Sequence, residues 1–216
     1  MLSATVVIDY QNLNLVGGNL FLEKSNVINS YIHPTKFAEL LIKLRNSKIL
    51  NKEITCLVTK ILVYRGLPSP EYDPLLNSRS KSQASRWKLD ARTEIVQRPL
   101  RYSFSKNKRD EFLLDANGKR IVIKREEKGI DVLCALALVR EARTSDLVIL
   151  ASQDTDLVPA IEEAVALKQA KIETFSWYSK SSRRSFELRS PVAPTWNTRL
   201  GEEEYFQCLD ETTYGV

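Results

Sequence analysis

The sequence predicts a three-layer α/β/α fold with a mainly parallel central sheet. Short, continuous apolar runs recur along the chain, and such runs are typical of strands buried on both faces. Segments with helical spacing of apolar residues separate these runs, and this alternation favours parallel strands joined by crossover helices. The chain has 216 residues, of which 43% are hydrophobic, so it is long enough to bury a core as a single domain, residues 1–216.

The first third of the chain contains two predicted strands and one predicted helix. The run TVVID, residues 5–9, predicts a buried strand, and residues 12–20, with two adjacent glycines, are expected to form a loop. Residues 34–48 predict a helix that begins at a proline and has apolar residues on one face. Residues 54–66 predict a second strand, which ends at a glycine.

The middle of the chain, from about residue 67 to 127, is expected to be an insertion into this core. It begins with a polar, proline-containing segment in which a short helix is expected. Residues 94–104 predict one strand. The pair Asn117-Gly118 lies between two strand-like runs and predicts a β-hairpin with a type I′ turn.

The last third alternates regularly between helix and strand. Residues 129–143 predict an apolar helix, residues 145–152 a buried strand and residues 156–170 an amphipathic helix. Residues 171–177 predict one more strand. From about residue 178 the chain is expected to form a polar, helix-prone C-terminal extension.

Histidine and cysteine are too scarce to carry most kinds of catalysis. The three cysteines are odd in number and widely spaced, which indicates neither a disulfide framework nor a cysteine metal site, and Cys134 is expected in the core. The one histidine, His33, is expected on an exposed loop. Zinc sites and serine or cysteine triads need more than this. Any chemistry is therefore expected to rest on carboxylates.

The sequence predicts a cytoplasmic protein. No stretch approaches the roughly 18 consecutive apolar residues that span a bilayer, so no membrane contact is expected. The first residues reach a charge at Asp9 without a basic leader, so no signal peptide is expected.

Acidic residues follow two of the predicted strands. Asp9 ends the first strand, and Asp154 and Asp156 follow the strand at 145–152. Asn12 is expected in the loop after the first strand, and Asp131 lies at the start of an apolar helix. Because carboxyl ends of parallel strands share one edge of a sheet, these side chains are expected to converge. Each carboxylate could instead cap a helix or bind loop amides.

Clustered carboxylates repel one another, and a divalent cation removes this cost. Oxygen ligands alone favour Mg²⁺ or Mn²⁺. Such an ion activates water and stabilises negative charge in phosphodiester hydrolysis, and no histidine is needed. The candidate metal ligands are Asp9, Asp131, Asp154 and Asp156.

The positive charge of the chain is localised. Between Arg79 and Lys128 there are 15 Lys and Arg against 7 Asp and Glu, a local net charge of +8, while the rest of the chain has −3. Such a patch suits a polyanion such as nucleic acid, although a solvated basic insertion is an alternative. The candidates for backbone binding are Arg86, Lys88, Arg92, Arg98 and Arg101.

Three segments resemble, in order, the signature blocks of the NYN domain, a family of the PIN-like nuclease superfamily. They are VVIDYQNLN at 6–14, KGIDVLCALAL at 128–138 and VILASQDTDLVPAIEEA at 148–164. Gln153 stands where the family usually has glycine. The matching positions are Asp9 and Asn12, then Lys128, Gly129 and Asp131, then Ser152, Asp154 and Asp156.

The resemblance implies a PIN-like α/β/α domain that is a Mg²⁺- or Mn²⁺-dependent endoribonuclease. Asp9, Asp154 and Asp156 would hold the metal directly or through water. Asp131 would complete the acidic pocket, and Asn12 would orient a water or a phosphate oxygen. The choice of RNA over DNA rests on the resemblance.

Two other functions stay open at this point. One is a catalytically silent RNA-binding or regulatory module that kept the pocket. The other is a phosphatase or small-nucleotide hydrolase that needs the metal but not the basic stretch. The sequence also leaves open a homo-oligomer or a regulatory protein partner.

Overall fold

A parallel sheet forms the middle layer of the molecule, and the predicted three-layer α/β/α fold is confirmed. The computed structural model describes residues 1–23, 30–181, 184–185 and 187–214. In this part of the chain the parallel strands follow the order β3-β2-β1-β6-β7-β9, and β8 pairs antiparallel with the end of β7. The strands are β1 (Leu2–Asp9), β2 (Cys56–Leu67), β3 (Thr93–Pro99), β6 (Leu147–Ala151), β7 (Lys171–Ser179), β8 (Arg184–Ser185) and β9 (Trp196–Leu200).

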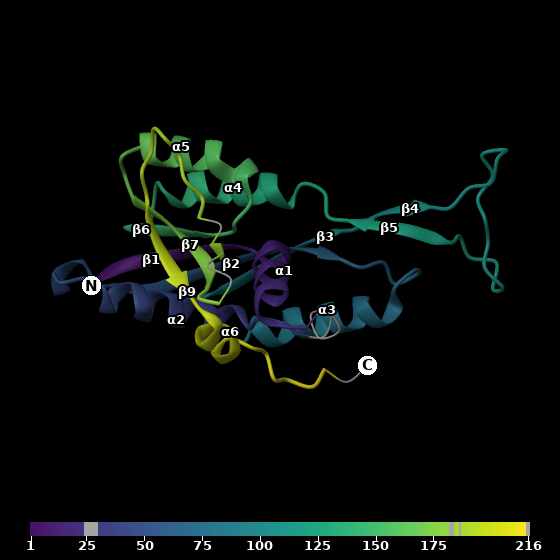
Figure 1. Ribbon diagram of the computed structural model, residues 1–216, viewed down its shortest axis with the longest axis horizontal. Helices are drawn as coiled ribbons and strands as arrows, with labels where there is room; N and C mark the ends of the chain where they lie inside the picture. The colour runs from purple at the N-terminus through teal and green to yellow at the C-terminus, as the bar shows by residue number, and fades with distance from the viewer. Residues whose placement is uncertain (24–29, 182–183, 186, 215–216) are drawn as a thin grey trace.

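Helices cover both faces of this sheet. In Figure 1, α4 and α5 lie on one face, and α1, α2, α3 and α6 lie on the other. None of the described helices combines the length and the apolar character that crossing a membrane requires. The helices are α1 (Tyr10–Phe21), α2 (Pro34–Ser47), α3 (Pro74–Trp87), α4 (Ile130–Glu141), α5 (Val158–Ala166) and α6 (Glu202–Gln207), with short 3₁₀ turns η2 (Lys52–Ile54) and η3 (Thr155–Leu157).

The continuous apolar runs are central strands because both of their faces are covered. Val6 and Ile8 of β1 belong to the core cluster on the α1 and α2 side, and Val7 belongs to the cluster beneath α4 and α5. All five residues of β6 are buried. Strict alternation of polar residues would bury polar groups in one of these two layers, so residues 6–8 of β1 and all of β6 are apolar.

The loop predicted at residues 12–20 is wrong, because this segment lies within helix α1. Asp9 caps the helix by accepting the backbone N–H of Asn12. Gly17 marks a close approach to the core: a Cβ there would lie 2.8 Å from Tyr205 Cε2 and 2.9 Å from Trp177 Nε1. The close packing of Tyr205 and Trp177 explains why residue 17 is a glycine. The helix forms there although glycine has a low helix propensity, which is why a loop was predicted.

Replacing Gly17 with Ala is expected to lower the free energy of unfolding by about 1–3 kcal/mol, since the methyl group overpacks two buried aromatic rings. Asn19→Ala is the control, because Asn19 is exposed on the same helix and Ala favours helix by a few tenths of a kcal/mol. Urea denaturation measures both variants. A Gly17→Ala protein as stable as the wild type would contradict this account of the helix.

The segment expected as an insertion divides into a core part and a projecting arm. Helix α3 and strand β3 belong to the core, and Trp87 is fully buried there. The strand predicted at 94–104 is interrupted at Leu100, whose backbone N–H still donates to the Leu67 carbonyl oxygen at the end of β2. Beyond it, β4 (Arg101–Phe104) and β5 (Val122–Glu126) form an antiparallel ribbon that projects far from the body (Figure 1). We call residues 101–126 the arm.

The turn at the end of the arm differs from the predicted type. Type I′ requires a positive φ at both central residues, but Gly118 has φ +75° and Asn117 is not in that region. The Asp115 carboxylate instead accepts the backbone N–H groups of Asn117 and Lys119, and the Gly118 N–H donates to the Asp115 carbonyl oxygen. A second turn, with Asp110 at φ +64°, makes the end of the arm two-lobed.

The expected C-terminal extension completes the fold. Strand β9 pairs in parallel with β7 at the edge of the sheet, and the short helix α6 buries Tyr205 against α1 and β7. The sequence WNTRL in β9 is short and half polar, so the strand was not predicted. An edge strand needs only one buried face, which explains this composition.

His33 was expected to be exposed, and this prediction is wrong. His33 is the residue before α2, is half-buried, and packs its ring edge-on against Trp87. The three cysteines are free and buried, as expected for Cys134 and for a chain without a disulfide framework.

Candidate functional site

A pocket of about 480 Å³ opens at the carboxyl ends of β1 and β6. The chain passes from β1 to β2 on one side and reaches β6 on the other, so the strand order reverses between these two strands. In open α/β sheets, this switch point leaves a crevice in which ligands bind. The pocket is lined by the end of β1, the first turns of α1 and α4, the segment before α4 and the loop after β6.

Asp9 lies at the bottom of this pocket and is almost fully buried. Its carboxylate accepts the backbone N–H of Asn12 and the hydroxyl of Ser152, each at 3.2 Å. Burial, together with smaller effects of the nearby Asp154 and Asp131 carboxylates, nevertheless raises the pKa of Asp9 to about 6. The site therefore resists holding several negative charges without a cation.

Hydrogen bonds fix the loop after β6 against α1 and β7. The Asn12 side-chain carbonyl accepts the Gln153 backbone N–H at 2.8 Å, and the Ser152 hydroxyl oxygen accepts the Asp154 N–H at 3.2 Å. The Gln153 side chain accepts the Trp177 N–H at 3.2 Å. The glutamine that departs from the family motif thus connects the loop to β7, and the Asn12 carbonyl oxygen holds the loop.

The structure separates the two carboxylates of the loop. Asp154 lines the pocket and caps η3, because its carboxylate accepts the Asp156 N–H at 3.1 Å. Asp156 is exposed in this turn and is not among the residues that line the pocket. In this 3₁₀ turn Asp154 is the capping residue. Asp156, which was predicted to be a metal ligand, lies outside the pocket.

Glu127 joins the pocket in a way that the sequence did not predict. Gly66 donates its backbone N–H to the Glu127 carboxylate, and a Cβ at Gly66 would lie 2.8 Å from Glu127 Cγ. Burial and the charge of Asp9 raise the pKa of Glu127 to about 7. The one available signal was its position, directly before the Lys-Gly pair of the second motif.

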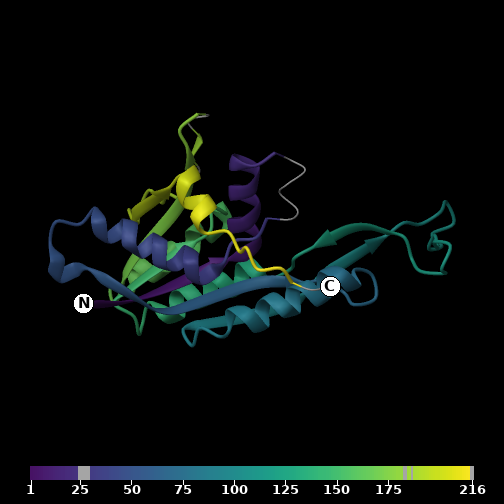
Figure 2. The ribbon, with the colours of Figure 1, turned by 90° about the horizontal axis from the view of Figure 1, so that it is seen from below.

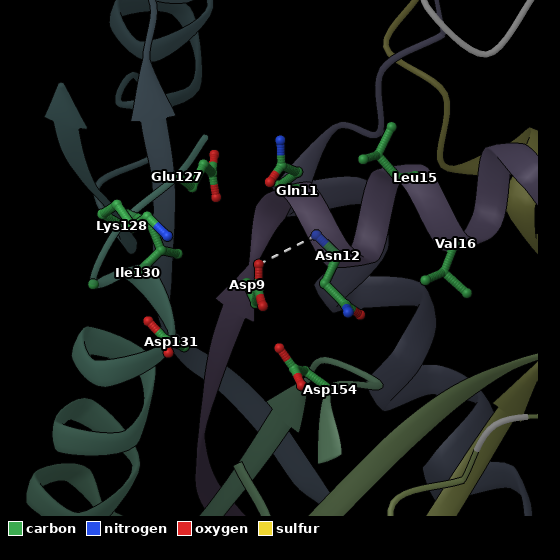
Figure 3. A pocket seen from close by; sticks show the side chains of 11 residues that line it. Asp9, Gln11, Asn12, Leu15, Val16, Glu127, Lys128, Ile130, Asp131 and Asp154 are labelled. Carbon is green, nitrogen blue, oxygen red and sulfur yellow. Dashed lines mark hydrogen bonds between the residues drawn. The ribbon is translucent and has the colours of Figure 1, made fainter. Parts of the chain in front are cut away.

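Four carboxylates thus share this pocket, and Figure 3 shows that Asp9, Asp131 and Asp154 point into one space with Glu127 across from them. Within the described residues, no three His, Cys, Asp or Glu side chains lie close enough to form a complete metal site. Mg²⁺ usually keeps several waters and needs only one or two carboxylates. The donor atoms therefore fit a hard, partly hydrated cation.

Replacing Glu127 with Gln is expected to stabilise the metal-free protein at alkaline pH. A carboxyl whose pKa is raised on folding destabilises the fold as pH rises from its unfolded pKa, near 4.5, to its folded pKa of about 7. A pKa unit corresponds to about 1.4 kcal/mol, and partial exposure reduces this to a total gain on the order of 1–2 kcal/mol at pH 8.

At pH 4 the Glu127→Gln protein and the wild type are expected to unfold at the same denaturant concentration. Unfolding in urea with EDTA at pH 4, 6 and 8 measures the difference, and Glu163→Gln, an exposed position on α5, is the control. An equal effect of Glu127→Gln on the free energy of unfolding at all three pH values would show that the pocket does not raise the pKa of Glu127.

The basic residues predicted to bind a nucleic-acid backbone lie at two opposite edges of the sheet. Arg98 and Arg101, near the end of β3 and the start of β4, are exposed on the same edge as the pocket. Helix α3 runs back to the amino ends of the strands. The side of the sheet opposite the pocket therefore carries Arg86, Lys88 and Arg92. These three are therefore poorly placed to hold a substrate of the pocket.

Arg92 is also engaged in ion pairs. Its guanidinium contacts the carboxylates of Asp90 at 2.7 Å and Glu39 at 2.6 Å. Both partners hold Arg92 beside the amino end of β3. Its charge is therefore already balanced within the fold.

Comparisons with known proteins support the fold and leave the function open. No protein-family model and no curated protein matches the chain. A crystal structure of a protein of unknown function from Vibrio parahaemolyticus RIMD 2210633 is similar, with a TM-score of 0.51 and 15% sequence identity over 97% of this chain and 96% of that one. The two chains thus share an α/β fold over nearly their whole lengths. The NYN resemblance rests on its three motifs alone, and the activity that it implies stays a prediction.

Proposed function

We propose that this chain is a metal-dependent ribonuclease that hydrolyses RNA phosphodiester bonds in the pocket at the β1–β6 edge. The observation that supports this most strongly is the group of carboxylates at the switch point of the sheet, with Asp9 desolvated at its base. A stable fold has no need to bury carboxylates beside one another. A divalent cation makes the arrangement favourable.

Each side chain of the pocket has a definite role in this proposal. Asp9 and Asp154 would hold Mg²⁺ or Mn²⁺, and Asp131 would do so through water. When bound, the ion would supply an activated water and stabilise charge on the phosphate. Lys128, a cation among the described residues that line the pocket, would contact the phosphate, and Glu127 would add negative charge opposite Asp9.

The three sequence motifs and the three free cysteines favour RNA as the substrate and a cytoplasmic location. RNA is favoured by the resemblance of three ordered motifs to the NYN domain. A cytoplasmic location is favoured by three free cysteines, which suit a reducing compartment.

Cleavage of labelled RNA and DNA tests this function. Purified protein is incubated with single-stranded RNA, structured RNA and the matching DNAs in Mg²⁺, Mn²⁺ or EDTA. We expect cutting of RNA that needs the metal and stops in EDTA. Cutting that persists in EDTA after extensive dialysis would contradict the proposed role of the carboxylates.

A catalytically silent RNA-binding module is the second candidate. It is favoured by the excess of Lys and Arg between Arg79 and Lys128, which suits RNA binding without cleavage. Salt-sensitive RNA binding, with no cutting in either metal, would select this function over the nuclease.

A further inference from the structure

The arm begins at the wall of the pocket. Strand β5 leads through Glu127, Lys128 and Gly129 directly into α4, and all three of these residues line the pocket. Figures 1 and 2 show the arm extending from this point away from the body, as seen from two perpendicular directions. A long ligand that enters the pocket would therefore have the arm beside it.

Positive charge lines this path. Residues 101–128 contain 9 Lys and Arg against 5 Asp and Glu. Lys124 and Lys128 share one acidic partner, Glu126, at 2.7 and 3.6 Å, so this pair of lysines keeps a net positive charge. At the end of the arm, Lys108 and Arg109 are exposed and form no ion pair with any described residue.

The base of the arm is bound to the body through Asp73. The Asp73 carboxylate accepts hydrogen bonds from the Tyr102 hydroxyl at 2.6 Å and from the Arg125 guanidinium at 2.8 Å. Toward the end of the arm, Phe104 contacts Phe112, and the Arg120 guanidinium lies 4.3 Å from the centre of the Phe112 ring. The bonds to Asp73 join the arm to the body, and the ring contacts hold the two sides of the arm together.

The exposed ring of Phe112 offers a stacking surface among the cations. Its side chain is 40% exposed, and Lys106 lies 5.0 Å from the centre of the ring. Aromatic rings beside a basic track are the means by which proteins bind single-stranded nucleic acid, because bases stack on the rings while cations hold the phosphates.

We propose that the arm is a second binding site for single-stranded RNA, separate from the pocket, and that it selects long substrates. This inference rests on the proposed function for the identity of the ligand. From Lys128 to Lys119 the chain covers nine residues, or about 30 Å at about 3.3 Å per strand residue. At about 3.4 Å per stacked nucleotide, a strand needs about nine nucleotides to occupy both sites.

A single strand suits this arm better than an RNA duplex. The major groove of A-form RNA is too deep and narrow to admit protein elements, whereas that of B-form DNA admits a two-stranded ribbon. Duplex DNA is therefore the competing ligand.

The test compares two double variants that remove the same charge. Lys108→Gln/Arg109→Gln alters the end of the arm, and Arg86→Gln/Lys88→Gln alters the opposite edge of the sheet. Binding of 5- and 20-nucleotide RNAs, of duplex RNA and of duplex DNA is measured by fluorescence anisotropy in EDTA between 50 and 200 mM salt. EDTA prevents cleavage, so the result does not depend on the proposed activity.

We expect the arm variant to lower the slope of log affinity against log salt by about 1.4 for the 20-nucleotide RNA, since each lost phosphate contact contributes about 0.7. The control variant and the 5-nucleotide RNA are expected to change little. In cleavage assays, KM for the long RNA is expected to rise several-fold with kcat unchanged.

Wild-type binding by the arm variant, equal affinity for both RNA lengths, or tighter binding of duplex DNA would overturn the inference. The first of these results would point to a protein partner for the apolar side chains exposed on the arm. Length-dependent RNA binding without any cleavage would support the arm and count against the proposed nuclease instead.

Discussion

Replacing Asp154 with Asn is expected to reduce RNA cleavage by about 10²- to 10³-fold or more, the size of effect seen when one charge-stabilising group is removed from an active site. The substitution removes a negative charge from the pocket but keeps an oxygen that can accept the Asp156 N–H, so the cap of η3 is retained. Cleavage rates in Mg²⁺ and the melting temperature are measured together. We expect the rate to fall and the melting temperature to stay within a few degrees of the wild type.

Asp156→Asn is the matched control for this experiment. It removes the same charge two residues away, from an exposed side chain outside the pocket. We expect it to cleave RNA at a rate close to that of the wild type. An Asp154→Asn protein with the wild-type rate would show that Asp154 takes no part in cleavage. An equal loss of rate in Asp156→Asn would show that cleavage does not depend on which of the two carboxylates lines the pocket.

Replacing Glu173 with Leu is expected to lower the free energy of unfolding by about 3–5 kcal/mol. Glu173 of β7 and Arg45 of α2 form a bidentate ion pair at 2.9 and 3.1 Å, and only 1% of each side chain is exposed. Without Glu173, the buried guanidinium keeps its bond to the Ile54 carbonyl oxygen but has lost its main counter-charge. Urea denaturation at pH 7 measures the loss.

Two further variants test whether the loss of stability comes from the unpaired charge of Arg45. Glu211→Gln breaks an exposed pair with Lys36 and is expected to change the free energy of unfolding by less than about 1 kcal/mol. The double variant Arg45→Met/Glu173→Leu is expected to recover much of the stability, because no unpaired charge remains. A single Glu173→Leu variant as stable as the wild type would show that water reaches this pair.

The sequence predicts the central layer well because burial on both faces leaves a strong signal. Strand β6 and residues 6–8 of β1 are continuous apolar runs, and helices α2 and α5 have apolar faces. Helix α1 was missed because Gly17 is dictated by Trp177 and Tyr205, which lie far away in the sequence. Local propensity cannot register such a contact.

The candidate site was predictable where it depends on strand ends alone. Asp9 and Asp154 meet because parallel strands place their carboxyl ends together, and Asp131 follows from the start of a crossover helix. Asp156 was predicted to face the pocket together with Asp154. The 3₁₀ turn at residues 155–157 places only the Asp154 carboxylate in the pocket. Glu127 was missed because its place depends on how the arm leaves the sheet past Gly66.

Anomalous diffraction from crystals grown with Mn²⁺ shows whether the pocket at the β1–β6 edge holds a divalent cation. We expect an anomalous peak bounded by Asp9 and Asp154 in the wild type, and no peak there in Asp154→Asn crystals grown in the same way. A pocket without a peak at millimolar Mn²⁺, or a peak that persists in the variant, would contradict the proposed metal site.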